Sequence, residues 1–181
     1  MLKVKSRFEF EGHKIAWGKI GQGAPMVLVH GFPWSSQIWR QIAPSLAARR
    51  TVYYFDMLGS GLSDKAADIR PEVQDRLLAA LLSFWELDRP EIVGHDFGGL
   101  ASLRAHFIRG CRFEKMTLIN AVGVLPSGSP FFSHVRQHEA VFRDLPAYAH
   151  EALLRAYMQA AADKQLRPEA LEIFLAPWIG E

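Results

Sequence analysis

The stretch from Glu91 to Leu100 predicts a strand, a sharp turn and a helix in quick succession. A short apolar run, Ile92-Val93, leads into Gly94-His95-Asp96-Phe97-Gly98, and a helical pattern begins directly after it. The two flanking glycines allow the backbone to pass closely beneath Asp96, whose own φ and ψ would then be strained. The N-terminus of the following helix favours a negative charge at that point.

The side chain at the centre of this turn indicates a particular chemistry. Strand, turn and helix in this order form a nucleophile elbow, in which G-x-S-x-G carries a serine; here the central residue is Asp96. Serine suits attack on a carbonyl, whereas a carboxylate can displace a leaving group from an sp3 carbon and form an alkyl ester. Hydrolysis of that ester by water requires an oxyanion hole facing Asp96. The alternative is that Asp96 only caps the helix.

Length and composition exclude several classes of protein. The 181 residues suit one domain with a smaller appendage, and 49% hydrophobic with 22% charged residues is ordinary for a globular protein. A net charge of +2 gives no sign of nucleic-acid binding. The single cysteine, Cys111, excludes an internal disulfide and fits a reducing compartment. Without a signal-like N-terminus or a membrane-length apolar run, the prediction is a cytoplasmic protein with no membrane partner.

The order of elements predicts a mostly parallel sheet. An antiparallel hairpin is expected first, followed by strands that alternate with helices, which implies right-handed crossovers. The expected ranges are 7–20 for the hairpin, 26–29, 51–55, 92–93 and 116–119 for strands, and 38–46, 71–87 and 97–109 for helices. Ligands bind beyond the carboxyl ends of such strands. The loops His30–Pro33 and Asp56–Asp64 should therefore meet Asp96 at one mouth.

The chain changes character near Pro126. Ser127-Gly128-Ser129-Pro130 resembles a linker, and helices are expected near 131–143, 146–162 and 168–175. The predicted organisation is a partial core at 1–125 and a helical cap, or lid, at 126–181.

Three motifs in this order resemble the α/β-hydrolase superfamily, in particular its haloalkane dehalogenase and epoxide hydrolase group. They are His30-Gly31-Phe32-Pro33, Asp56 with its glycine-rich loop, and Gly94-His95-Asp96-Phe97-Gly98-Gly99. The resemblance implies an α/β fold with an α/β-hydrolase core and a helical lid. The Asp56 loop is interpreted as structural, and because it lacks G-x-G-x-x-G no dinucleotide site or other cofactor is expected.

The resemblance also implies roles for individual residues. The backbone N–H groups of Phe32 and Phe97 would form the oxyanion hole for Asp96, and the substrate would be a small alkyl halide or epoxide. Lid tyrosines of epoxide hydrolases protonate the opening ring oxygen, for which Tyr148 and Tyr157 are the candidates. Dehalogenases hold the halide with donors such as a Trp N–H, for which Trp34 and Trp178 are the candidates. Ordinary packing is the alternative for each of these aromatic side chains.

The sequence departs from the family pattern at the hydrolytic step. Such enzymes need a histidine to activate water and an acid to orient it, and the family places them beyond the lid. Asn120-Ala121-Val122 offers no carboxylate after the sixth strand. We therefore expect a core lacking its last strands, which could be inactive alone and could self-associate through the uncovered sheet edge. There are two alternatives. One is a non-catalytic remnant or small-molecule-binding module, and the other is an esterase-like hydrolase.

None of the other histidines is expected to serve as the base. His95 should point away from its neighbour Asp96, His30 should be hydrogen-bonded within its own loop, and His106 should lie behind the turn. His150 belongs to the lid, where a surface role is the simpler interpretation. His134 and His138 have the i, i+4 spacing of metal ligands, but no third ligand matches, so no metal is predicted.

Overall fold

The computed structural model describes residues 1–124 and 128–179. The chain divides into two compact units, Met1–Gly123 (unit 1) and Val124–Glu181 (unit 2). The predicted boundary at 125–126 and the linker residues Pro126 and Ser127 lie outside the described residues.

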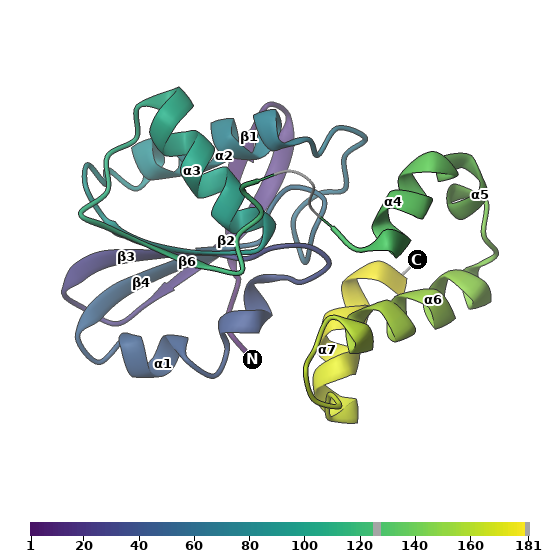
Figure 1. The fold of residues 1–181 in the computed structure, drawn as a ribbon. Coiled ribbons are helices and arrows are strands. Elements are labelled where there is room, and N and C mark those ends of the chain that lie inside the picture. Colours follow the sequence, from purple (N-terminus) through teal and green to yellow (C-terminus); the bar gives the residue numbers. More distant parts are fainter. Residues whose placement is uncertain (125–127, 180–181) are drawn as a thin grey trace. The chain divides into compact units, whose positions relative to one another are not determined.

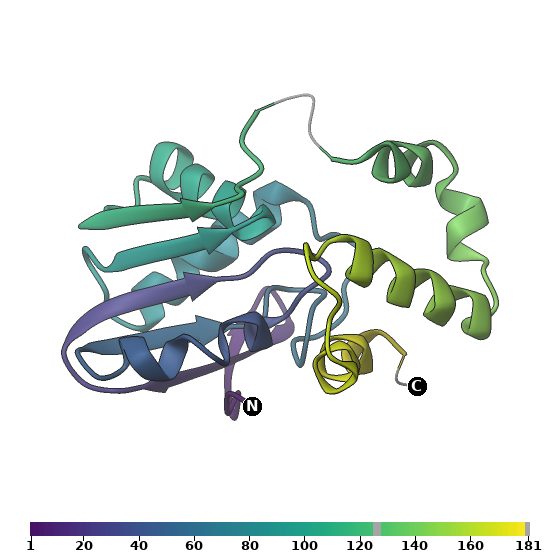
Figure 2. The ribbon, with the colours of Figure 1, turned by 60° about the horizontal axis from the view of Figure 1, so that its bottom comes forward.

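Unit 1 is built on a six-stranded sheet with the order β1-β2-β4-β3-β5-β6 (Figures 1 and 2). β1 and β2 pair antiparallel, β2 joins β4 antiparallel, and the remaining neighbours are parallel. The predicted mostly parallel α/β fold is therefore confirmed. The strands are β1 Ser6–Phe10, β2 His13–Ile20, β3 Ala24–Val29, β4 Arg50–Phe55, β5 Glu91–His95 and β6 Lys115–Ile119.

Helices cover both faces of this sheet. α2 (Pro71–Phe84) and α3 (Phe97–Arg109) lie on one face, and the 3-10 turn η1 (Ser36–Trp39) and α1 (Ala43–Leu46) lie on the other (Figure 1). Successive side chains of a strand point to opposite faces, so Val27 and Val29 join one core and Leu28 joins the other. A strand covered on both faces must be apolar throughout, which explains the continuous run in β3.

Two predicted helices of unit 1 differ from the structure. The single helix expected at 38–46 is divided into η1 and α1, because Pro44 has no N–H to continue a helix and lies in the first turn of α1 instead. α2 ends at Phe84 rather than Leu87, in a Schellman motif with Glu86 at φ 57°. The motif is closed by bonds from the N–H of Leu87 to Leu82 O (2.9 Å) and of Glu86 to Ser83 O (3.0 Å).

Unit 2 is helical throughout its described part. Its helices are α4 (Pro130–Gln137), α5 (Glu139–Arg143), α6 (Ala147–Ala160) and α7 (Pro168–Ile179). The helix expected at 131–143 is broken at His138, whose φ of −124° and ψ of 36° are not helical. α6 and α7 pack together and bury Met158, Phe174 and Leu175. Among the residues described in both units, no helix is long and apolar enough to cross a membrane.

β6 forms one edge of the sheet in the described structure, and its outer residues are apolar. Leu118 and Ile119 are each 40% exposed. An edge strand presents unpaired N–H and C=O groups, and apolar side chains beside them favour pairing with another chain.

We therefore expect the 181-residue chain to self-associate through β6, and Leu118→Lys to lower the associated fraction several-fold. The lysine would place a charge where two β6 edges must meet. Sedimentation velocity over a concentration series measures the effect. Ile42→Lys is the matched control, because Ile42 is similarly exposed, at 47%, but lies at the start of α1 and not in β6. Equal association of both variants would place the contact elsewhere.

Candidate active site

At the turn between β5 and α3, the start of the helix lies unusually close to β5 and to the end of β3. A Cβ on Gly98 would lie 2.3 Å from His30 O, and one on Gly94 would lie 2.7 Å from Gly99 Cα. Both positions therefore require glycine. Between them Asp96 has φ 53° and ψ −122°, the strained conformation that the sequence predicts. Its backbone is held by a bond from its N–H to Ile119 O (3.0 Å).

The carboxylate of Asp96 does not cap α3. Asp96 occupies the N-cap position, but its side chain makes no capping hydrogen bond. Instead Oδ1 accepts the backbone N–H of Phe32 at 3.2 Å, across 64 positions of sequence. The capping alternative is therefore wrong for this residue, and the carboxylate faces the loop that follows β3.

The electrostatic surroundings of Asp96 are mixed. Burial raises the pKa of Asp96 above its ordinary value, while the backbone N–H groups of Phe97 and Phe32 and the ring of His95 act in the opposite direction. A partly desolvated carboxylate is a stronger nucleophile than a hydrated one. The two N–H groups named by the family resemblance are thus both at the Asp96 carboxylate.

His30 fixes the loop that carries Phe32. The ring is fully buried, Nε2 accepts the N–H of Met57 at 2.9 Å, and Nδ1 lies 2.9 Å from Gly31 O. These partners assign the tautomer with the proton on Nδ1, which donates to the carbonyl. Burial lowers the pKa of His30, and Nε2 can accept the Met57 N–H only when it carries no proton. With both nitrogens engaged, His30 positions the loop and is not available as a base.

The Asp56 loop is fastened by its own carboxylate. Oδ1 accepts the N–H of Ser36 and Oδ2 accepts the N–H of Leu62, each at 2.8 Å. A Cβ on Gly61, which has φ 52°, would lie 2.2 Å from Asp56 Oδ2. Oδ2 therefore closes the loop and Oδ1 ties it to η1, which supports the structural interpretation of Asp56.

The aromatic candidates divide between the two units. The rings of Phe32 and Phe97 contact each other with centroids 5.3 Å apart, and Trp34 is 7% exposed in the loop after Pro33. The lid candidates belong to unit 2. Tyr148 is 79% exposed, Tyr157 lines a pocket, and Trp178 is half-buried in α7. The substrate-binding roles of Trp34 and of the three lid residues stay predictions.

The remaining histidines do not bond to Asp96 within the described residues. His95 packs edge-to-face on Trp39 with ring centroids 6.3 Å apart, and burial lowers its pKa. His106 is exposed and its Nδ1 lies 2.8 Å from Cys111 O. His134 and His138 contact each other with centroids 4.5 Å apart, but the described chain contains no group of three or more side chains suited to a metal ion.

Gly31 lies against the Asp96 carboxylate, a contact that the sequence interpretation missed. A Cβ there would lie 2.2 Å from Asp96 Oδ1 and 2.8 Å from Cγ. Only a glycine lets the Phe32 loop approach the carboxylate this closely. The glycine of His30-Gly31-Phe32-Pro33 was the available signal, but its contact is with a residue distant in sequence.

We expect Gly31→Ala to slow alkylation of Asp96 by about 10²-fold, because displacing a reacting group by about 1 Å costs that much. The φ of Gly31 is not positive, so alanine itself is tolerated by the backbone. The rate of adduct formation with a reactive alkyl halide, followed by mass spectrometry, is the measurement. Gly123→Ala is the matched control, since its Cβ would meet Leu103 Cδ1 at an ordinary 3.6 Å. A Gly31→Ala variant as fast as this control would contradict the assignment.

Comparison with known proteins agrees with this geometry. A family model described as "alpha/beta hydrolase fold" matches residues 24–161. A 2-hydroxy-6-oxo-2,4-heptadienoate hydrolase from Pseudomonas putida is 37% identical over 112 residues, which cover 58% of this chain and 40% of that protein. A soluble epoxide hydrolase from a Corynebacterium species is 30% identical over 124 residues, covering 66% of this chain and 43% of that protein. A haloalkane dehalogenase from Sphingobium indicum is also similar, at 33% over 105 residues, 53% of this chain and 34% of that protein.

Among solved structures, an α/β-hydrolase fold protein from Burkholderia ambifaria superimposes with a TM-score of 0.97 at 51% identity. The match covers 99% of this chain and 67% of that chain. The chain covers less of the curated relatives: each alignment with the three proteins of the preceding paragraph spans less than half of that protein's length. The fold, the family match and the relatives together show that the chain belongs to the α/β-hydrolase family, with haloalkane dehalogenases and epoxide hydrolases among its relatives.

Proposed function

We propose that this protein is a hydrolase that forms an alkyl ester on Asp96 from a small alkyl halide or epoxide. One observation carries the proposal. Asp96 lies at the strained turn, and its carboxylate makes no capping hydrogen bond but accepts the backbone N–H of Phe32. A residue that served only to cap the helix would make neither this contact nor this conformation.

The geometry assigns different roles to the two carboxylate oxygens. Oδ1 accepts the Phe32 N–H, so Oδ2 attacks the substrate carbon. A C–O bond forms and the C–halogen bond, or one C–O bond of the epoxide, breaks with its electron pair. Water then attacks Cγ of the ester, and the negative charge develops on Oδ1, where the N–H groups of Phe32 and Phe97 stabilise it. Collapse releases the alcohol and restores the carboxylate.

The second step also needs a base for the attacking water. None of the hydrogen bonds to the Asp96 carboxylate comes from a histidine in the ranges 1–124 and 128–179. His30, the buried histidine of the neighbouring loop, uses both ring nitrogens for that loop. We therefore propose that the 181-residue chain accumulates the Asp96 ester and turns over slowly.

The relatives support this proposal without selecting the substrate. The names of two of them describe epoxide and haloalkane chemistry, while that of the 2-hydroxy-6-oxo-2,4-heptadienoate hydrolase describes a keto-acid substrate. An esterase-like reaction on a carbonyl substrate is disfavoured by a carboxylate at the turn. A non-catalytic binding module is the other alternative. We also propose a cytoplasmic location for the hydrolase.

Incubation with 1-bromobutane or with styrene oxide tests the function directly. Intact-mass measurement followed by peptide mapping is expected to find one adduct, on Asp96, with either or both reagents. Halide release should stay near one equivalent per chain, and diol release should stay below one equivalent, because diol forms only when the ester is hydrolysed. No adduct at Asp96 would favour the binding module, and hydrolysis of p-nitrophenyl acetate that survives loss of Asp96 would favour another nucleophile.

A further inference from the structure

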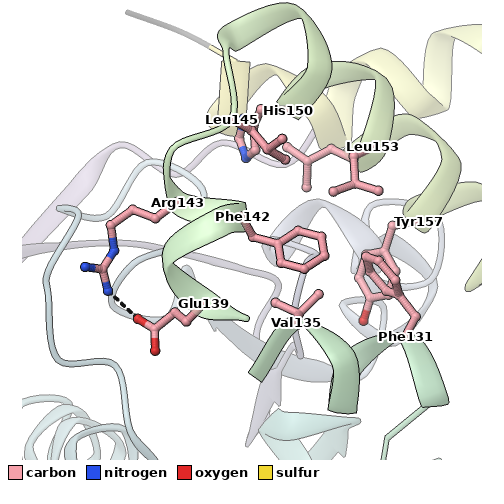
Figure 3. Close-up of a pocket in the computed structure, with 10 residues that line it drawn as sticks. Phe131, Val135, Glu139, Phe142, Arg143, Leu145, His150, Leu153 and Tyr157 are labelled. Atoms are coloured by element: carbon pink, nitrogen blue, oxygen red, sulfur yellow. Dashed lines mark hydrogen bonds and ion pairs between the residues drawn. The ribbon is translucent and has the colours of Figure 1, made fainter. Parts of the chain in front are cut away.

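Unit 2 contains a pocket of about 350 Å³, and the residues that line it all belong to this unit. It lies between α4, α5 and α6 (Figure 3). Figure 3 shows Val135, Phe142 and Tyr157 pointing into the same space from three different helices. The lining is largely apolar: Phe131, Val135, Phe142, Leu145, Leu153, Leu154 and Tyr157 contribute to it, with His150, Glu139 and Arg143.

The helices around this pocket are packed to different degrees. α6 and α7 bury Met158, Phe174 and Leu175, whereas α4 and α5 contribute no fully buried residue. Phe131 and Val135, one turn apart on α4, are only half-buried although they face the pocket. Apolar surface left in water forfeits about 25 cal/mol per Å² of stabilisation. An apolar molecule in the pocket would recover part of that stabilisation.

The aromatic rings and the charges of the pocket define the kind of molecule. The ring of Phe131 lies 5.9 Å from that of Phe142, edge-to-face at 86°, and 5.5 Å from that of Tyr157. Rings in such tilted arrangements accept a further aromatic ring favourably. The charged lining residues Glu139 and Arg143 form an ion pair with each other. The pocket therefore carries no net charge for an ionic ligand to neutralise.

We propose that unit 2 binds a neutral aromatic molecule of one or two rings in this pocket, independently of Asp96. The volume lies at the lower end of the roughly 300–1,000 Å³ that small-molecule sites occupy, which sets the limit of two rings. The inference goes beyond the proposed function, because the residues that line the pocket belong to unit 2 and do not include Asp96.

Naphthalene is a suitable probe for this site, and the 181-residue chain is the protein to use. Saturation-transfer NMR is expected to detect its binding, and Val135→Trp, which fills the pocket from α4, should weaken the binding at least ten-fold. Val141→Trp is the matched control, because Val141 is 65% exposed on α5 and does not line the pocket. This control should bind as the unmodified chain does. Naphthalene-1-sulfonate should bind more weakly than naphthalene.

Three further results decide the inference. Leu153→Trp fills the same space from α6, so its agreement with Val135→Trp, with helical circular dichroism preserved in both, excludes misfolding as the cause of weaker binding. Asp96→Asn should bind naphthalene unchanged, whether or not Asp96 forms an adduct with alkyl halides. The inference is overturned if naphthalene does not bind, if either tryptophan variant binds as well as the control, or if binding disappears in Asp96→Asn.

Discussion

Asp96→Asn is expected to reduce covalent labelling by alkyl halides and epoxides to background. The asparagine side chain keeps the size of aspartate, so the turn and the Phe32 loop can retain their arrangement, but an amide has no anionic oxygen to attack carbon. The measurement is the adduct mass on the peptide that contains position 96, after equal exposure of both proteins. Asp88→Asn is the matched control, because Asp88 is an exposed carboxylate of unit 1 paired with Arg112. Labelling that persists in Asp96→Asn would identify another nucleophile.

The same variant has an expected effect on stability. Burial raises the pKa of Asp96 in the folded protein, so the folded state holds a proton over a pH range in which the unfolded chain has released it. The contribution of Asp96 to the free energy of unfolding therefore falls as the pH rises from the ordinary pKa of an aspartate through the raised pKa of Asp96. Asp96→Asn should melt at a higher temperature than the unmodified protein at pH 7, and the difference should shrink at acid pH.

The pH dependence of labelling follows from the same shift. Only the ionised carboxylate attacks, so the rate should fall as the pH drops through the raised pKa of Asp96, above the region where an exposed aspartate would protonate. Denaturation must be monitored at each pH. A rate that stays constant down to the ordinary pKa of an aspartate would show that the carboxylate is hydrated.

The sequence predicts the sheet of unit 1 well because burial dictates its pattern. A strand covered on both faces must be apolar, and the run Met26–Val29 has no other simple explanation. The helix boundaries were predicted less well, because local features outweigh periodicity. Pro44 ends one helical pattern, and His138 interrupts another. No apolar position is lost at either break, so the pattern alone does not reveal it.

The candidate site was predicted in part for a similar reason. Asp96, Phe32 and Phe97 belong to motifs whose backbone geometry depends on nearby glycines, and the structure brings the three together. The contact between Gly31 and Asp96 joins two motifs that are far apart, so neither motif shows it separately. The lid aromatics lie on helices whose apolar positions pack as readily as they bind. For that reason the sequence does not separate the two roles for Tyr148, Tyr157 and Trp178.

The largest expected effect on stability is at Asp75, which joins α2 to α3. Its side chain is fully buried and accepts the Nε of Arg104 and the Nε of Arg109, each at 2.7 Å. The side chains of Arg104 and Arg109 are only 23% and 32% exposed. Asp75→Ala would remove this partner from both arginines, although Arg104 would keep its ion pair with the half-exposed Glu72 at 3.1 Å. Breaking a buried pair in this way costs about 3–5 kcal/mol. We expect about 3 kcal/mol here, because water still reaches both arginine side chains.

Urea unfolding followed by the fluorescence of the core tryptophan Trp85 measures this loss, as a decrease of about 1–2 M in the unfolding midpoint. Asp88→Ala is the control, since it removes an exposed ion pair with Arg112 that should contribute no more than about 1 kcal/mol. Replacing all three members together, by Asp75→Leu with Arg104→Met and Arg109→Met, should recover most of the stability, because the only charge left without its partner is that of Glu72, whose side chain is 50% exposed. If Asp75→Ala costs no more than Asp88→Ala, the two arginines rehydrate freely and the triad does not hold α2 against α3.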